Sequence, residues 1–207
     1  MRLRKIAYMQ QVHPSYLSFV IATHREADDC TAPIIVIGFG MFNVRKLDRD
    51  DWRFSLSASV ADTTDDEAAL LTRMADALPQ PDFLVGEHVE THLFAPLLQA
   101  VDRIPPPVGP YLRLRVARLR LALPVDVALG SARRSAPLPY AEPMPTPSPI
   151  AVELVAPNII NRDNAIARLE AHAIGNWLRF LRRPGTPHVN VAMVPTLTWA
   201  ASRGWKI

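Results

Sequence analysis

The sequence predicts an α/β domain with a mixed sheet flanked by helices. Two observations predict this class: short apolar runs rich in β-forming residues, and longer segments whose apolar residues recur at helical spacing. A third is their order, since three strand-like runs in succession are followed by a helix, a short strand and a second helix. That order is typical of an α/β domain with a mixed sheet.

The strand-like runs differ in how they alternate. Tyr16–Thr23 is rich in β-formers, and Ile34–Gly40 is a continuous apolar run, which predicts a central strand covered on both faces. Trp52–Ser57 alternates at period two, so we expect one solvated face. Gly38 and Gly40 lack the spacing of a phosphate-binding loop, and we interpret them as strand bends.

The segment from residue 64 to 101 is organised as helix, strand and helix. Thr64 and Glu67 have the spacing of a capping box, which predicts a helix start, and Pro79 ends the apolar-striped helix that follows. Phe83–Val85 then reads as a short strand, which Gly86 closes. Leu93–Val101 predicts a second helix with a proline in its first turn.

Residues 105–149 form a region rich in proline and arginine, which we predict to be a variable insertion within the domain. Eleven prolines lie in it, and Tyr111–Leu123 interleaves arginines with apolar residues. Period two fits both ends of that run, so we expect a bulged basic strand, either a solvated face or a phosphate-contacting edge. Ser135–Pro149 predicts a polyproline-like loop.

The last third predicts a long helix and a short strand. Asn164 is the expected cap, and Pro184 with Gly185 is the expected stop. Val189–Val194 reads as a short strand, and we expect Trp199 and Trp205 to anchor the tail. At the other end, residues 1–12 are expected to form an arm or a first strand.

Length and composition limit the organisation and the chemistry. We expect a single domain over residues 1–207, because a domain usually takes about 100–200 residues, and 49% hydrophobic residues are enough for a packed core. No apolar run approaches the ~20 residues that span a bilayer, and no signal peptide is recognisable, so we expect a cytoplasmic protein without membrane contact. The single cysteine, Cys30, excludes an intramolecular disulfide and a cysteine-based zinc site, and its acidic neighbours argue against a nucleophile.

Four sets of segments form an ordered pattern along the chain. They are Phe19-Val20-Ile21-Ala22-Thr23 with Ile37-Gly38-Phe39; Glu67-Ala68-Ala69-Leu70-Leu71 with Leu84-Val85-Gly86; His88 with Leu93-Phe94-Ala95-Pro96-Leu97-Leu98; and Arg168-Leu169-Glu170-Ala171-His172 with Trp177-Leu178-Arg179-Phe180-Leu181-Arg182. In this order the chain resembles the DEDD-type 3′–5′ exonucleases of the RNase H-like superfamily, related to the proofreading exonucleases of family B polymerases. The resemblance covers about residues 15–183 and implies an RNase H-like, exonuclease-type mixed sheet with a proline-rich insertion.

The chain departs from that family where the metal ligands belong. Such an exonuclease uses four carboxylates to hold two metal ions that activate water. By the resemblance, the four carboxylate positions and the tyrosine that orients the water fall on Val20, Ala22, Leu93 or Phe94, His172 and Arg168. Hydrocarbon cannot replace the oxygen ligands that hard cations require. We therefore predict a catalytically inactive domain with no cofactor.

A rebuilt metal site is the alternative interpretation. His88, Glu90 and His92 alternate, so on a strand they would share one face and, with Glu87 or His172 nearby, could bind a divalent metal in an active nuclease. The competing interpretation is a polar loop with ordinary hydrogen bonds, because no metal-binding motif surrounds these residues. Asp126 is a further acid, although one carboxylate does not make a site.

The favoured hypothesis is an inactive exonuclease-like domain that binds nucleic acid or acts as a protein scaffold. A net charge of +3 is compatible with nucleic acid. The candidate phosphate contacts are Arg113, Arg115, Arg118, Arg120, Arg133, Arg134, Arg179, Arg182 and Arg183. A protein partner or a homo-oligomer also stays open, with residues 135–149 as a docking strap.

Overall fold

The computed structural model describes residues 13–24, 33–48, 51–61, 66–127, 162–183 and 187–205. In these ranges the strands are β1 (Ser15–His24), β2 (Ile35–Lys46), β3 (Trp52–Val60), β4 (Phe83–Gly86) and β5 (Leu123–Asp126). The helices are α1 (Glu67–Ala77), α2 (Ala95–Arg103), α3 (Val108–Leu119), α4 (Arg162–Leu181), α5 (Pro187–Asn190) and α6 (Met193–Ser202). A π-helical turn, Val89–Phe94, leads directly into α2.

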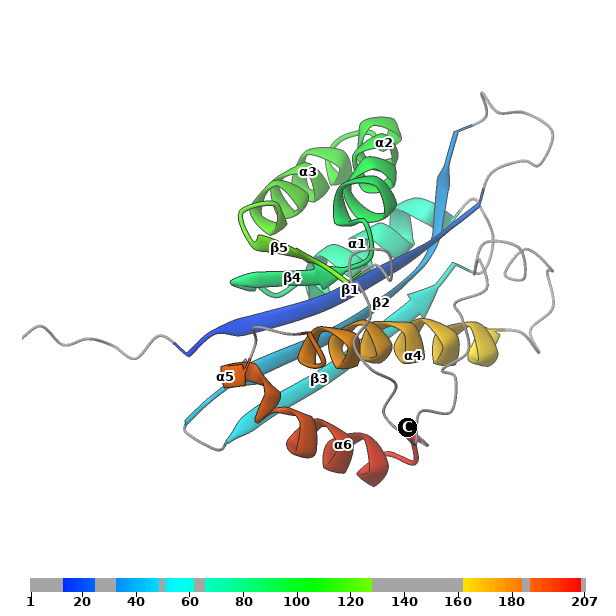
Figure 1. The fold of residues 1–207 in the computed structure, drawn as a ribbon. Coiled ribbons are helices and arrows are strands. Elements are labelled where there is room, and N and C mark those ends of the chain that lie inside the picture. The colour runs from blue at the N-terminus through cyan, green and yellow to red at the C-terminus, as the bar shows by residue number, and fades with distance from the viewer. Residues whose placement is uncertain are drawn as a thin grey trace, which may run out of the picture.

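The strands form one mixed sheet in the order β3-β2-β1-β4-β5 (Figure 1). β1 pairs antiparallel with β2, and β2 pairs antiparallel with β3, because short connections join these strands. β1 pairs parallel with β4, and β4 with β5, because helices intervene. The predicted α/β class with a mixed sheet is confirmed.

Helices cover both faces of this sheet, with α1, α2 and α3 on one side and α4, α5 and α6 on the other (Figure 1). The side chains of β1 alternate between the two cores. Leu17 and Phe19 pack in the α1–α3 core, whereas Tyr16 and Val20 pack in the α4–α6 core. β2 is buried along most of its length, and β3 alternates between exposed and half-buried positions, as their sequences predict.

The close approach of α4 to β2 explains why residue 40 is a glycine. A Cβ atom at this position would lie 2.5 Å from the backbone oxygen of Leu169 in α4. No L-amino acid with a side chain fits there without a shift of the helix. The packing of α4 on β2 therefore requires a glycine at position 40. The interpretation of Gly40 as a strand bend did not foresee this role.

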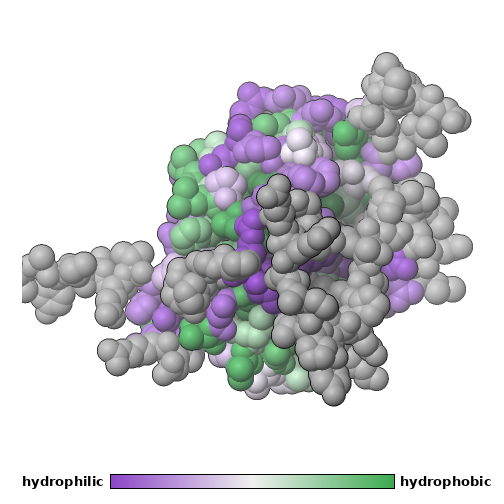
Figure 2. Space-filling view, in the orientation of Figure 1, coloured by the Kyte–Doolittle hydropathy of each residue, from purple (hydrophilic) through white to green (hydrophobic). Residues whose placement is uncertain are grey.

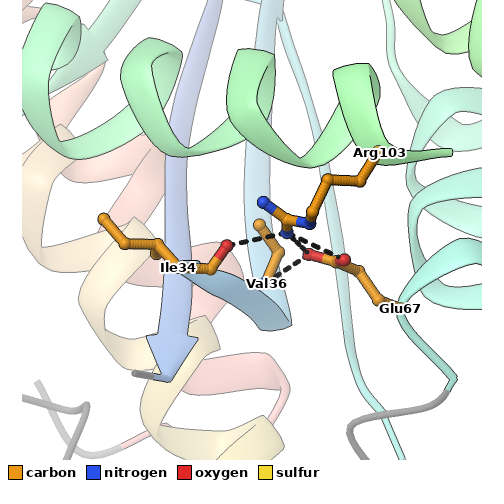
Figure 3. A network of polar contacts seen from close by, with 4 residues as sticks. All are labelled: Ile34, Val36, Glu67 and Arg103. Atoms are coloured by element: carbon orange, nitrogen blue, oxygen red, sulfur yellow. Dashed lines mark hydrogen bonds and ion pairs between the residues drawn. The ribbon is translucent and has the colours of Figure 1, made fainter. Parts of the chain in front are cut away.

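The carboxylate of Glu67 connects three elements (Figure 3). Its Oε1 accepts a hydrogen bond of 2.7 Å from the backbone N–H of Val36, at the start of β2. Arg103, at the end of α2, donates to both carboxylate oxygens at 2.9 and 3.0 Å and to the carbonyl of Ile34 at 2.8 Å. The predicted partner of the box, Thr64, lies outside the described residues. Glu67 thus joins α1 to β2 and α2.

The predicted basic strand over Tyr111–Leu123 is wrong, because most of this run is helix α3. Leu112, Val116 and Leu119 recur at helical spacing and are buried in the α1–α3 core. Arginines two and three residues apart fit the period of a strand as well as that of a helix. The burial of the two leucines and the valine at helical spacing therefore selects the helix. The predicted variable region therefore contributes α3 and β5 to the domain.

Two predictions in the last third are also wrong. α4 begins at Arg162, so Asn164 lies within the helix and does not cap it. Val189–Val194 is not a strand, because Val189, Ala192 and Thr196 are buried at helical spacing in α5, α6 and the turn between them. Trp199 of α6 packs its ring against those of Phe42 and Phe54, as expected of an anchor.

Several predictions fall outside the described residues. They concern residues 1–12, Cys30, Arg133, Arg134, the 135–149 loop and the stop at Pro184 and Gly185. Among the helices that the structure describes, none combines the length and the apolar character needed to cross a membrane.

Candidate functional site

The positions where the exonuclease resemblance places metal ligands are buried hydrocarbon. Val20 and Ala22 of β1 are 8% and 2% exposed and pack in the core under α4. Leu93 and Phe94 are each 3% exposed and pack in the opposite core, under α1–α3. The structure therefore places Val20 and Ala22 together, but divides them from Leu93 and Phe94.

The fourth position, His172, lies on a side of α4 that carries buried polar groups. Both ring nitrogens of His172 and both amide atoms of Asn176, one turn further on, are buried without a hydrogen-bond partner. Burial lowers the pKa of His172, so its imidazole is neutral at pH 7. Arg168, at the predicted tyrosine position, is exposed one turn before His172. A neutral imidazole and an amide provide no negative charge for a pair of divalent ions.

An ion pair that the sequence did not reveal joins the same helix to the end of β4. Arg179 of α4 contacts the carboxylate of Glu87, and both side chains are largely buried. Desolvation lowers the pKa of Arg179 from its ordinary value. Separated by almost a hundred residues, these two groups carried no local signal of their pairing. The carboxylate of Glu87 therefore pairs with an arginine in this structure, rather than with the histidines of the predicted metal site.

The segment that follows Glu87 is a π-helical turn, so the prediction of alternating side chains on a strand is wrong. Val89, Leu93 and Phe94 turn into the core and require a helical path. His88 has φ 46°, and its backbone N–H donates to Asp126 Oδ1 at 3.1 Å. The rings of His88 and His92, four residues apart, meet edge to face at 5.0 Å between centroids.

Three of the four side chains of the predicted alternative metal site have partners outside the set, and the ring of the fourth, His92, meets that of His88. Glu87 contacts Arg179, Glu90 lies 3.3 Å from Arg120, and the His88 ring lies 3.5 Å from the Asp126 carboxylate. Across the described ranges, no three His, Cys, Asp or Glu side chains gather closely enough to hold a metal ion. The geometry matches ordinary hydrogen bonds and ion pairs.

Most of the predicted arginines make contacts within the protein. Arg115 donates to the carbonyls of Ala75 and Leu78, so it joins α3 to the end of α1. Arg113 pairs with Asp102 at 2.6 Å. Arg120 pairs with Glu90 and places its guanidinium over the ring of Phe94.

The remaining arginines are dispersed. Arg118 on α3 and Arg182 after α4 are exposed, and their side chains make no hydrogen bond or ion pair with another described residue. Arg183 is half-buried and has an interaction of its own. α3 and α4 cover opposite faces of the sheet (Figure 1), so these cations do not form one continuous patch.

Exposed apolar side chains gather at two places instead. Figure 2 shows hydrophobic residues over the end of α3 and β5, and again over α6. Exposed large apolar residues in and after α3 are Leu114, Leu121 and Leu123, and those between α5 and the middle of α6 are Val191, Val194 and Leu197. Comparison of the chain with protein-family models, with curated proteins and with solved structures finds no match.

Proposed function

We propose that this protein is a catalytically inactive 3′–5′ exonuclease-like domain that acts as a protein-binding scaffold. The observation that carries the proposal is the burial of Val20, Ala22, Leu93 and Phe94 at positions where the family resemblance requires carboxylates. Two divalent cations need several oxygen ligands, and a hydrocarbon core supplies none.

The order and layering of the elements are compatible with the resemblance, whereas the division of Val20 and Ala22 from Leu93 and Phe94 between two cores is not, because the four carboxylates of that family share one metal site. β1, which carries the Phe19–Thr23 segment, is the middle strand of a mixed sheet, and helices cover both of its faces. α4, which carries the last segment of the resemblance, packs across β1 and β2. An RNase H-like sheet of the exonuclease type is therefore the fold that we propose for this domain.

A protein partner is favoured over nucleic acid by how the arginines are used. Four of the seven described candidates, Arg113, Arg115, Arg120 and Arg179, contact carboxylates or backbone carbonyls of the protein itself. A phosphate-binding surface usually presents several free cations along one track. Exposed apolar side chains, by contrast, are typical of protein interfaces when they are contiguous.

The proposal is tested by two assays on the full chain. Labelled single-stranded DNA and RNA are incubated with Mg²⁺, Mn²⁺ or Zn²⁺, and we expect no degradation. Oligonucleotide binding is titrated with salt, and we expect no tight, salt-sensitive complex. Metal-dependent degradation that His88→Ala abolishes would instead support a nuclease rebuilt around Glu87, His88, Glu90 and His92. A tight, salt-sensitive complex would replace the protein scaffold with a nucleic-acid-binding module.

A further inference from the structure

α3 has a second apolar face that no other described element covers. Its inner face packs in the core, as described above. Its outer face presents residues spaced by four, three and four positions: Pro110, Leu114, Ala117 and, in the turn that ends the helix, Leu121. All four are exposed, Leu114 by 51% and Leu121 by 83%. This set, called the α3 seam below, has the heptad spacing of one half of a helix–helix interface.

The α3 seam borders an open hollow between α2 and α3. The hollow has a volume of about 580 Å³, and its walls include Val101 and Ile104 from the end of α2. Gly109 allows this geometry, because a Cβ atom there would lie 2.1 Å from the Ile104 carbonyl oxygen. An apolar groove beside a helical seam is the shape used for binding an amphipathic helix.

Arginines flank the α3 seam on both sides. Arg113 and Arg120 each precede a seam residue, and Arg118 follows Ala117. These are the positions that face the charged flanks of a partner in a helix pair. The pairs of Arg113 with Asp102 and Arg120 with Glu90 are exposed and therefore weak and exchangeable. Arg118 has no such partner within the described residues.

The flanking charges argue against a second copy of this chain. In a parallel pair of identical seams, Arg113 would face Arg118 of the other copy, and in an antiparallel pair it would face Arg120. Like charges at these positions oppose association. An acidic helix would meet the positive charges of Arg113, Arg118 and Arg120. Only two nearby carboxylates, Asp102 and Glu90, offset these charges within the protein.

We propose that the α3 seam binds an acidic amphipathic helix of a partner protein. The partner helix carries large aliphatic residues at heptad spacing and glutamate or aspartate on both flanks. This inference rests on the proposed role as a protein-binding scaffold, and it adds the surface and the chemistry of the partner.

The test uses two synthetic helical peptides of about three heptads, both with leucine along the seam. One has glutamate on both flanks, and the other has lysine. Binding of each labelled peptide to the full chain is measured by fluorescence anisotropy. We expect the acidic peptide to bind at least about tenfold more tightly than the basic one, and salt to reduce the difference.

Two variants locate the peptide and two more serve as matched controls. Leu114→Glu is expected to weaken the acidic peptide by at least about tenfold, because it places a charge within the seam. Arg118→Glu breaks no described contact and is expected to weaken the acidic peptide and strengthen the basic one. Val194→Glu on α6 and Arg182→Glu after α4 make the same changes on exposed sites elsewhere, and we expect both to bind as wild type does.

Four results would overturn the inference. They are equal affinity for the two peptides, no binding of the acidic peptide at about 100 μM, displacement of the peptide by a single-stranded oligonucleotide, and a wild-type dimer that Leu114→Glu dissociates. The last two would assign the seam to nucleic acid or to a second copy. Loss of peptide binding without metal-dependent nuclease activity refutes only the seam, whereas nuclease activity refutes the proposed function whatever the peptides do.

Discussion

The contacts of Glu67 lead to a quantitative prediction about stability. Glu67→Ala removes the acceptor of the Val36 N–H, which is buried at the start of β2. An unpaired buried N–H costs about 1–3 kcal/mol. The same change leaves Arg103 without its carboxylate, at a site where the Glu67 side chain is 12% exposed and the Arg103 side chain 32%. Because that pair is only partly desolvated, we add about 1 kcal/mol.

The expected total is a loss of about 2–4 kcal/mol in the free energy of unfolding. For a chain of this size, the loss lowers Tm by about 4–16 °C. Urea unfolding followed by tryptophan fluorescence measures the first quantity, and calorimetry the second. Glu67→Gln keeps an oxygen acceptor for Val36 but loses the charge, so we expect an intermediate loss.

The matched control is Asp102→Ala, which breaks an ion pair whose two side chains are each 66% exposed. We expect it to cost no more than about 0.5 kcal/mol. The reasoning is refuted if Glu67→Ala stays within that range, or if the two variants lose the same stability. Either result would mean that Glu67 is not what joins α1 to β2 and α2.

Two further predictions concern α4. Gly40→Ala is expected to destabilise the protein by about 1–3 kcal/mol, because the new Cβ would meet the Leu169 backbone oxygen at 2.5 Å. Gly86→Ala is the control, because its new Cβ would meet only the movable Val89 side chain at 3.2 Å. Urea unfolding should show a smaller loss of stability for Gly86→Ala than for Gly40→Ala. A larger loss for Gly86→Ala would contradict the packing of α4 on β2. For His172, burial lowers the folded-state pKa below 6.5, so the unfolded chain binds the proton more readily. Stability should therefore fall as the pH drops below about 6.5, and His172→Gln should reduce this dependence. Urea unfolding at several pH values measures it for both proteins. If the variant shows the same pH dependence as the wild type, His172 is not buried and neutral.

The local patterns that predicted the fold correctly are those with one period and a clear boundary. The continuous apolar run of β2 predicted its burial on both faces, and the alternation in β3 predicted one solvated face. Pro79 predicted the end of α1, and the apolar stripe of α4 predicted a long helix. These features depend on neighbours in the sequence, so the sequence was enough to identify them.

The errors occurred where two periods fit the same residues. Arginines at 113, 115, 118 and 120 suit a strand as well as a helix, and only the burial of Leu112, Val116 and Leu119 against the core selects α3. His88, Glu90 and His92 alternate in the sequence, but the core contacts of Val89 and Phe94 select a π-helical turn. Tertiary packing overrides a weak local preference in both cases.

The sequence by itself determined the α/β class, most of the strands and helices, and the absence of carboxylates at four positions of the exonuclease pattern. Only the tertiary structure decided which groups the charged side chains contact: Glu87 pairs with Arg179, Glu67 pairs with Arg103, and Arg115 donates hydrogen bonds to the end of α1. It also decided that α3 has an outer apolar seam. The physical reason is that periodicity depends on residues a few positions apart, whereas an ion pair or an uncovered face depends on which distant segments the fold brings together.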